Sequence, residues 1–197
     1  RLPTERTISE HLGIGRNSTR EALSILHGMG MIRRVQGSGN YVTGDAHRAI
    51  RQICTMMLAL GTITKKDVCE FRRVLEKSAC LLLSEKGVPA DERRQFEEIL
   101  AAMESADEKT LPALDCDFHT MLLRATGNSL MVTVLDAIAE VYQKWIDIVI
   151  RKTGEDEKNR LQAYHKGIYT SLSEADTDLA LRFVDDHYDL IEEMLEL

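Results

Sequence analysis

The sequence predicts a mainly α-helical protein in which an N-terminal winged helix-turn-helix is followed by an all-α antiparallel helical bundle. Two short helix signals and one glycine-rich hairpin signal fill the first 44 residues. Beyond them, apolar residues recur at helical spacing over long stretches that few glycines or prolines interrupt. The two parts also differ in the sign of their net charge. We therefore expect two domains, at residues 1–44 and 45–197.

The composition is that of a folded protein. Of the 197 residues, 44% are hydrophobic and 29% are charged, which is unlike disordered or low-complexity sequences. No apolar run approaches the ~20 residues that cross a bilayer, and no secretion signal opens the sequence, so we expect a soluble, cytoplasmic protein. The cysteines form no Cys-x-x-Cys pair and lie in apolar stretches, which indicates reduced, buried thiols. They are Cys54, Cys69, Cys80 and Cys116.

Charge separates the head of the chain, residues 1–44, from the remainder. The head carries six basic and three acidic residues, a net charge of +3, whereas the whole chain carries -7, which leaves -10 for the remainder. A small basic part joined to a larger acidic part indicates two modules with different partners. The basic module suits nucleic acid.

Two short helices are expected in the head. Thr4 or Thr7 can cap a first helix that runs to about Leu12. A second helix is expected to begin near Asn17, because Ser18-Thr19-Arg20-Glu21 has the spacing of a capping box. The two helices are separated by only a short turn.

A hairpin follows the second helix. Residues 32–35 and 41–43 have strand-like composition, and they flank the glycine-rich stretch 36–40, which suits a tight hairpin tip. The order helix, turn, helix and hairpin is the layout of a winged helix-turn-helix.

Polar side chains gather where such a domain contacts DNA. The second helix of a helix-turn-helix lies in the major groove, and its first turn in this sequence carries Arg16, Asn17, Ser18, Thr19 and Arg20. Their donors suit guanine edges and phosphate oxygens, and Arg6 on the preceding helix suits a backbone phosphate. A lone arginine is more often plain solvated surface. The paired helices and the glycine-rich tip favour the DNA-binding interpretation.

Several stretches of the head follow one another in the order and spacing of a known domain. They are Leu2-Pro3-Thr4-Glu5-Arg6, Gly15-Arg16-Asn17-Ser18-Thr19-Arg20-Glu21-Ala22-Leu23, Leu26, Gly30-Met31-Ile32 and Gly37-Ser38-Gly39-Asn40-Tyr41-Val42. Together they resemble the DNA-binding domain of GntR-family bacterial transcription regulators. The resemblance implies that Arg6, Arg16 and Arg20 are the principal DNA contacts and that Gly39 belongs to the wing tip. Gly15 departs from the usual serine, and we expect the domain to lack the helix that normally precedes the Leu-Pro pair.

The sequence after residue 44 predicts seven helices. They are expected at about 46–60, 64–86, 90–105, 108–125, 128–151, 156–173 and 175–196. Short connections favour antiparallel neighbours in a bundle. The helix at 46–60 links the two modules and is where we expect a signal to pass between them.

Four polar residues fall on the apolar stripes of three of these helices. Asp115 and His119 lie four residues apart on one helix, and His165 and His187 lie on two others. A single histidine on an apolar stripe is more often a hydrogen-bonded core residue than a ligand. Burying four such groups without partners costs on the order of several kcal/mol, and one divalent cation satisfies all of them.

Three imidazoles and one carboxylate suit a first-row divalent metal ion. Zinc is the first choice, with nickel, manganese and iron(II) as alternatives. Cys116 places a thiol next to Asp115. We expect that thiol to pack as a small apolar side chain.

Arg72 lies within the apolar stripe of its helix, whereas Arg73 is turned outward. One interpretation pairs Arg72 with Glu76, one turn further on. The other reserves the guanidinium for an anionic ligand, because its planar fork matches a carboxylate. The sequence alone does not decide between these two interpretations of Arg72.

A second resemblance covers these helices. The matching residues are Glu70-Phe71-Arg72, Leu75-Glu76, Asp115-Cys116-Asp117-Phe118-His119, Thr126-Gly127-Asn128, His165 and His187. They resemble the FCD effector-binding domain of the FadR subgroup of GntR regulators. The resemblance implies that Asp115, His119, His165 and His187 bind a metal. It also implies that a small organic acid binds there, with Arg72 contributing.

The sequence thus leads to one hypothesis and two rivals. We expect a homodimeric transcription regulator that binds a near-palindromic double-stranded DNA operator and responds to a small carboxylic acid effector. A metal-dependent hydrolase that activates water at the Asp/His site is one rival. A regulator whose metal is purely structural is the other.

Overall fold

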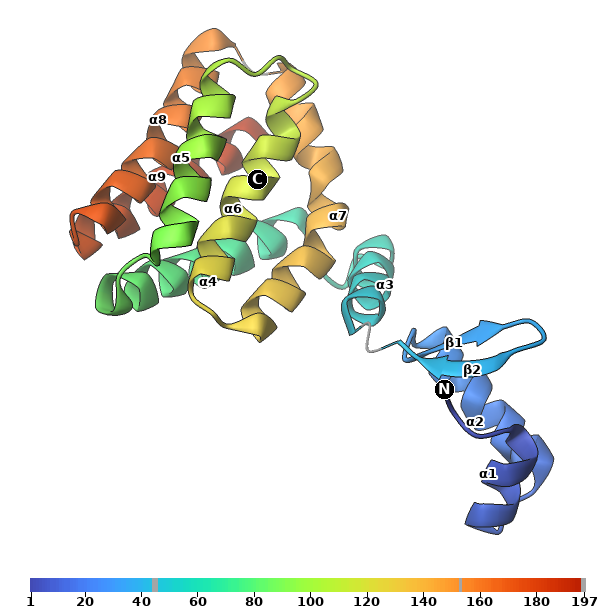
Figure 1. The fold of residues 1–197 in the computed structure, drawn as a ribbon. Helices are drawn as coiled ribbons and strands as arrows, with labels where there is room; N and C mark the ends of the chain where they lie inside the picture. The colour runs from blue at the N-terminus through green and yellow to red at the C-terminus, as the bar shows by residue number, and fades with distance from the viewer. Residues whose placement is uncertain (44–45, 153, 196–197) are drawn as a thin grey trace. The chain divides into compact units, whose positions relative to one another are not determined.

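The structure is a computed structural model, and it describes residues 1–43, 46–152 and 154–195. It divides into two compact units, Arg1–Cys54 and Thr55–Leu197. The elements in chain order (Figure 1) are α1 Glu5–Leu12, α2 Arg16–Gly28, β1 Ile32–Val35, β2 Gly39–Val42, α3 Ala46–Ala59, α4 Lys65–Lys86, α5 Ala90–Glu104, α6 Leu111–Ala125, α7 Ser129–Lys152, α8 Glu155–Ser173 and α9 Thr177–Leu195. The predicted fold class, a winged helix-turn-helix followed by an all-α bundle, is confirmed.

The first helix begins as its sequence predicts. The hydroxyl oxygen of Thr4 accepts a hydrogen bond from the backbone N–H of Thr7 at 3.2 Å, which caps α1. Gly13 ends the helix in the left-handed conformation, with φ 66°. A short turn then leads into α2.

The second helix begins earlier than predicted, and its expected capping box is wrong. Gly15 is the N-cap, without a side-chain cap, and Ser18 lies inside the first turn. The physical reason lies in Thr19, which is buried and shares a hydrogen bond of 2.8 Å with the hydroxyl of Ser9 on α1. This contact joins the two helices and fixes the face of α2 that is turned away from solvent.

The wing is a two-stranded antiparallel sheet. β1 pairs with β2 so that Ile32 lies opposite Val42 and Val35 lies opposite Gly39. Gly39 has φ 116°, a region that L side chains rarely adopt. The backbone N–H of Leu2 donates to the carbonyl of Asn40 at 2.8 Å, which attaches the start of the chain to the wing.

The second unit is the helical bundle. α4 packs against α6 and α9, α6 packs against α5 and α7, and α8 packs against α9 (Figure 1). Thr64 and Asp67 form a capping box that starts α4. Fully buried apolar side chains from successive helices fill the core, among them Phe96, Phe118 and Ile168.

Helices α8 and α9 approach each other closely at a glycine. A Cβ at Gly167 of α8 would lie 2.6 Å from a ring carbon of Phe183 on α9, closer than real Cβ atoms come to other atoms. Glycine is therefore the residue that permits this packing. Gly167 closely follows His165 in the sequence, and Phe183 lies about one helical turn before His187.

Most predicted helix bounds agree with the structure to within a few residues. The helix expected from residue 108 begins at Leu111, because Asp107 starts a turn and its carboxylate accepts from the backbone N–H of Thr110 at 2.9 Å. The predicted domain boundary at 44–45 and the predicted helix end at 196 lie outside the described residues.

The four cysteines are free thiols, and the prediction that they are buried is confirmed for two of them only. Cys69 and Cys80 are buried, whereas Cys54 and Cys116 are half-buried. Among the described residues, no helix combines the length and the apolar character that crossing a bilayer requires.

Candidate metal centre and nucleic-acid interface

The first turn of α2 presents polar side chains to solvent. Arg16, Asn17, Ser18 and Arg20 are exposed. Thr19, also predicted as a donor to DNA, is instead buried against α1, where its hydroxyl bonds to Ser9. One face of the turn therefore holds the helix in place while the other offers hydrogen-bond donors. This is the arrangement that a recognition helix needs.

Two of the predicted DNA contacts form ion pairs within the first unit. The Nε of Arg20 donates to a carboxylate oxygen of Glu5 at 3.3 Å, and Arg6 lies 3.9 Å from the carboxylate of Glu10. Both arginines are exposed, so water screens these pairs and weakens them. The arginine side chains remain accessible to phosphate.

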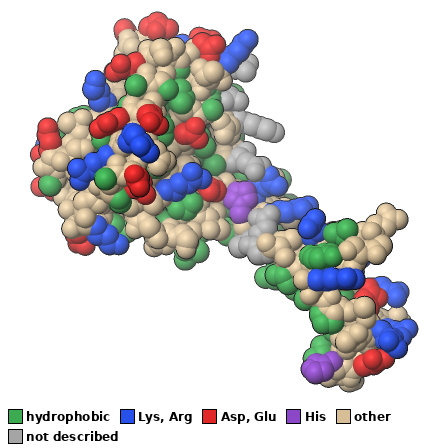
Figure 2. All heavy atoms as spheres, in the orientation of Figure 1, with side chains coloured by type: hydrophobic (Ala, Val, Ile, Leu, Met, Phe, Trp, Pro, Cys, Tyr) green, Lys and Arg blue, Asp and Glu red, His purple; other side chains and the backbone are tan. Residues whose placement is uncertain are grey.

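Two basic residues at the wing were not among the predicted DNA contacts, Arg34 of β1 and Arg1, which precedes α1. Arg34 donates from Nη2 to the hydroxyl of Ser24 at 2.7 Å, and the guanidinium of Arg1 lies beside Gly39 at the exposed wing tip. Arg1 and Arg34 line a shallow groove along the wing together with Gln36. Figure 2 shows more basic than acidic side chains on the visible face of the smaller unit. The charge count of the head was the signal that pointed to them.

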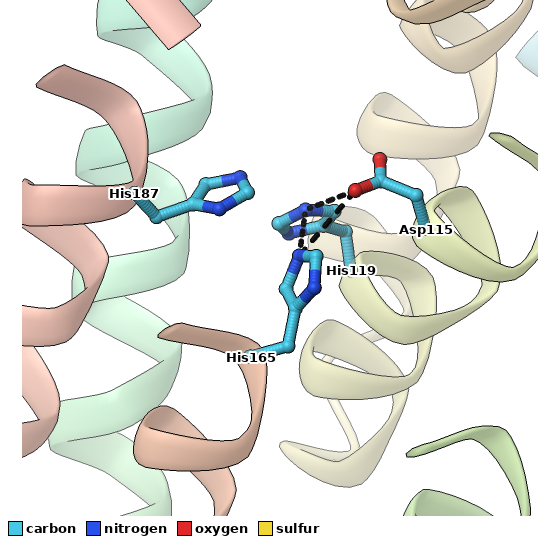
Figure 3. Close-up of side chains that lie close together, drawn as sticks. All are labelled: Asp115, His119, His165 and His187. Atoms are coloured by element: carbon cyan, nitrogen blue, oxygen red, sulfur yellow. Dashed lines mark hydrogen bonds and ion pairs between the residues drawn. The ribbon is translucent and has the colours of Figure 1, made fainter. Parts of the chain in front are cut away.

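The four predicted metal-ligating residues lie together inside the bundle. Asp115 and His119 come from α6, His165 from α8 and His187 from α9, and all four are buried. One ligand atom from each lies within 4.8 Å of the others. Figure 3 shows the carboxylate and the three imidazole rings turned toward one another.

The shortest distances within this cluster join ring nitrogens to each other and to the carboxylate. The Nε2 atoms of His119 and His165 are 3.3 Å apart. One oxygen of Asp115 lies 3.4 Å from Nε2 of His165 and 3.7 Å from Nε2 of His119. The same two imidazole nitrogens and the same oxygen therefore face a common point.

The cluster fits a divalent metal ion. Nitrogen and oxygen ligands lie about 2.0–2.2 Å from zinc, so ligands across an ion are roughly 4 Å apart, close to the observed spread. The Nδ1 atoms of His165 and His187 are buried and have no hydrogen-bond partner in the structure. Nε2 of His165, Nε2 of His119 and one oxygen of Asp115 lie 3.3–3.7 Å apart, and a positive ion between them would offset the cost of burying this carboxylate beside the rings.

The electrostatics of the cluster favour metal ligation. Burial lowers the pKa of His165 to about 4 and holds the pKa of His187 well below its usual value, so both rings are neutral near pH 7. Burial alone would raise the pKa of Asp115, but the neighbouring histidines, His119 first, bring it far below its usual range. Neutral imidazoles and an ionised carboxylate are the forms that bind metals.

His119 differs from the other two histidines. Burial alone would lower its pKa, but the charges of Glu76 and Asp115 raise it to about 9. A metal ion that binds Nε2 therefore displaces a proton at neutral pH.

Glu76 is a member of the site that the sequence interpretation considered only as a partner for Arg72. It is fully buried on α4, and its Oε2 lies 2.7 Å from Nδ1 of His119. Its other oxygen accepts a hydrogen bond from the hydroxyl of Tyr188 on α9. Burial would raise the pKa of Glu76, but the positive charges of His119 and Arg72 keep it low. Glu76 therefore joins α4 to α6 and α9.

Arg72 is buried, with 4% of its surface exposed, and keeps unused donors. Its Nη2 lies 3.7 Å from Glu76, an ion pair without a hydrogen bond, and its Nε and Nη2 have no hydrogen-bond partner. Its guanidinium carbon lies 3.8 Å from the ring centroid of Tyr142, which supports the cation by a cation–π contact. The pairing with Glu76 therefore exists, yet it leaves hydrogen-bonding capacity for a ligand.

Arg73 and Cys116 directly follow Arg72 and Asp115 in the sequence, but they differ from them in their contacts and chemistry. Arg73, predicted to be turned outward, is half-buried against α9, where it donates to Asp189 at 2.6 Å and to Glu192 at 3.1 Å. Burial raises the pKa of the Cys116 thiol, so the thiol stays protonated and is a poor metal ligand.

Two domain families match the chain. The family described as bacterial regulatory proteins, gntR family, matches residues 1–42, and the FCD domain family matches residues 67–190. The first match covers the winged unit, and the second covers α4 to α9 up to residue 190.

Curated relatives and solved structures agree with these two domain-family matches. The chain is 26% identical over 194 residues to the Glc operon transcriptional activator of Escherichia coli K12, covering 94% of this chain and 76% of that protein. It is 28% identical over 183 residues to the HTH-type transcriptional regulator LutR of Bacillus subtilis, covering 88% and 81%. It is 26% identical over 148 residues to the putative L-lactate dehydrogenase operon regulatory protein of E. coli K12, covering 73% and 57%.

A solved structure titled Streptococcus agalactiae GntR shares the fold, with a TM-score of 0.71 and 23% identity over 98% of this chain and 88% of that one. The matching families and the curated relatives are transcription regulators, not hydrolases. The chain belongs to the GntR family of DNA-binding bacterial transcription regulators, and its helical bundle is an FCD domain.

Proposed function

We propose that this regulator binds a divalent metal ion at Asp115, His119, His165 and His187, and that a small carboxylic acid binding beside the ion changes its affinity for operator DNA. One observation carries the proposal: the four ligand atoms converge within 4.8 Å in the bundle core. Arg72 supports the acid-binding part, because a buried guanidinium with unsatisfied donors suits an anion.

The donor set decides which ions are worth testing. Three imidazoles and one carboxylate suit zinc first and nickel, manganese or iron(II) next. When bound, such an ion supplies a positive charge and open coordination for a ligand oxygen. The chain's own contribution is to hold neutral rings and an ionised Asp115 away from bulk water.

The charge of Arg72 and the name of one relative together suggest the chemical class of the effector. Arg72 matches the two oxygens of a carboxylate, and its charge is only partly balanced by Glu76 at 3.7 Å. One relative is named as a regulatory protein of an L-lactate dehydrogenase operon. A 2-hydroxy acid such as L-lactate is therefore the first probe, because its hydroxyl and carboxylate oxygens suit a metal ion together.

On the DNA side, we propose that the exposed donors of the head contact the operator. The proposed contacts are Arg6, Arg16, Asn17, Ser18, Arg20 and Gly39. We also propose a homodimer of the FadR subgroup, acting in the cytoplasm, because a two-fold protein matches a near-palindromic site. The proposed domains are 1–44 and 45–197, linked through α3. The effector's influence on operator affinity then equals its differential affinity for two arrangements of the chain.

The test begins with the full-length chain as purified. Metal analysis and mass spectrometry identify any ion and any small acid that accompany it. L-lactate and other small carboxylates are then titrated into the metal-loaded protein, while melting temperature and binding to an operator fragment selected in vitro are followed. Stabilisation with altered operator affinity supports the sensor. Stabilisation by metal with no response to any acid favours a structural metal.

A matched pair of arginine variants sharpens this test. Arg72→Gln removes the buried fork, and we expect it to weaken L-lactate binding at least tenfold, since hydrogen bonds to charged groups contribute about 1.5–3 kcal/mol. Arg73→Gln removes a neighbouring arginine that already pairs with Asp189 and Glu192 of α9, and we expect it to leave the binding of the acid unchanged. Equal binding by both variants would contradict the role of Arg72.

A further inference from the structure

We propose that Glu76 is a positioning residue that holds the proton of His119 on Nδ1 and so presents Nε2 of that ring to the metal ion. The inference deepens the proposed metal-dependent function and depends on it. It concerns a residue outside the four ligands, on a helix that contributes none of them.

The contact between the two side chains fixes the direction of the hydrogen bond. Oε2 of Glu76 lies 2.7 Å from Nδ1 of His119, and neither side chain is exposed. An ionised carboxylate only accepts hydrogen bonds, so the hydrogen belongs to Nδ1. The lone pair of the neutral ring is then on Nε2, which is the nitrogen that faces Asp115 and His165.

The other oxygen of Glu76 keeps the carboxylate in this orientation. The hydroxyl of Tyr188 donates to Oε1, and Nη2 of Arg72 lies 3.7 Å from the same atom. Both neighbours are donors, so Oε1 is held on the side away from His119. The carboxylate cannot turn without losing one of these contacts.

The other two histidines lack such a partner. The Nδ1 atoms of His165 and His187 are buried and unpartnered. Among the histidines of the cluster, a carboxylate therefore fixes the proton of His119 alone. A change at Glu76 is expected to act on that ring and not equally on all three.

The substitution Glu76→Gln separates charge from shape. The glutamine side chain has one oxygen and one NH2 group, and Arg72, which can only donate, favours the oxygen on its side, where Tyr188 can donate to it as well. The NH2 group is then left facing Nδ1 of His119. That ring satisfies the contact by accepting at Nδ1, which moves its proton to Nε2 and blocks the nitrogen that binds the ion.

The experiment compares Glu76→Gln with Glu70→Gln in the full-length chain. Glu70 lies on the same helix, is exposed and pairs with Lys66 at 3.9 Å, so its replacement leaves the contacts of Glu76 intact and is the matched control. Affinity for Zn²⁺ is measured by chelator competition, and the positions of the imidazole protons by 15N NMR. We expect a loss of about 10–100-fold in Zn²⁺ affinity for Glu76→Gln and no loss for Glu70→Gln.

The NMR readout separates positioning from mere structure. In the Zn-loaded wild type the proton of His119 is expected on Nδ1, and in metal-free Glu76→Gln on Nε2. Wild-type Zn²⁺ affinity in Glu76→Gln would overturn the inference, as would an equal loss in both variants, which would show that the loss is not specific to the contact with His119. If Glu76→Gln does not fold, the inference is tested by the NMR spectrum of the Zn-loaded wild type alone. A proton on Nδ1 of His119 supports the inference, and a proton on Nε2 overturns it.

Failure of the proposed function gives a different result. A wild type that takes up none of the divalent ions named above, Zn²⁺ among them, refutes the metal-dependent function. The inference on Glu76 is then decided in metal-free protein. A slowly exchanging Nδ1 proton on His119 that is present in the wild type and absent in Glu76→Gln supports it, and absence of that proton from the wild type overturns it.

Discussion

Arg20 on α2 donates a hydrogen bond to Glu5 on α1 at 3.3 Å, and the two residues are 15 positions apart in the sequence. The arginine side chain is 62% exposed, so the pair restrains it without withdrawing it from solvent. A phosphate oxygen can replace the carboxylate of Glu5 as its acceptor. If Arg20 contacts DNA as proposed, the same pair positions its side chain before DNA arrives.

Replacing Arg16 or Arg20 with alanine is expected to weaken operator binding by about 1–3 kcal/mol if the side chain contacts a base, with metal content unchanged. A residue that contacts only phosphate is expected to weaken binding to all sequences alike and to reduce the salt dependence. Fluorescence anisotropy at several salt concentrations measures both effects. Arg94→Ala, at an exposed bundle position, is the control. Unaltered binding in both head variants would remove these residues as contacts.

Metal removal is expected to lower the melting temperature of the chain. An ion present at about 100 times its dissociation constant stabilises the folded state by about 2.7 kcal/mol, and a chelator removes that contribution. His165→Ala is expected to abolish the response to metal, whereas His27→Ala, at an exposed position of α2, keeps it. A full response to metal in His165→Ala would exclude that residue as a ligand.

Metal affinity is expected to rise with pH between about 5 and 8. The pKa of His119 is about 9, so binding at its Nε2 releases about one proton per ion in this range. His165, with a pKa of about 4, and His187 are already neutral and release none. Chelator competition at several pH values measures the slope, which flattens above pH 9. A pH-independent affinity from 5 to 8 would contradict a protonated His119 in the metal-free protein.

The metal-free protein is expected to lose stability as pH rises from about 7 to 9. The folded-state pKa of His119 is raised from 6.5 to about 9, so its contribution is fully present below pH 6.5 and is lost as pH rises through 9. His165 and His187 are neutral in both states above pH 7 and add no slope there. Urea unfolding with chelator present measures this trend. Constant stability over the range would contradict the raised pKa.

Gly167→Ala is expected to destabilise the bundle by about 1–3 kcal/mol and to weaken metal binding. The added Cβ would lie 2.6 Å from the ring of Phe183, which forces α8 and α9 apart beside His165 and His187. Gly28→Ala provides a control, since no atom lies within 4 Å of a Cβ there. Denaturant unfolding and chelator competition together measure the two effects. Equal values in both variants would show that the helices adjust freely.

Local sequence patterns predicted the helices and strands well, because the apolar spacing and the glycines that define each element lie within or next to that element. The spacing of apolar residues and the glycines between them gave helices close to those observed, and the glycine-rich stretch gave the wing. The start of α2 was predicted wrongly, because Ser18 has the right spacing for a cap while the neighbouring Thr19 is held by Ser9 of another helix. That contact is invisible in the pattern of α2 alone.

The site was predictable only where its polar residues interrupt an apolar stripe. Asp115 and His119 stand out on α6, as do His165 and His187 on their helices. Glu76 does not stand out, because it lies 43 residues from His119 and has a plausible partner in Arg72 on its own helix. Its role depends on which helices pack together, which no local pattern states.

The ligands of the proposed ion come from three helices, and His119 and His165 are 46 residues apart in the chain. An ion held by both closes a long loop, and it joins the last two helices to the middle of the bundle at a single point. Closing such a loop restricts the unfolded chain, much as a cross-link would. The metal-loaded bundle is therefore expected to unfold in one cooperative step, whereas in the metal-free bundle the C-terminal helices can unfold first.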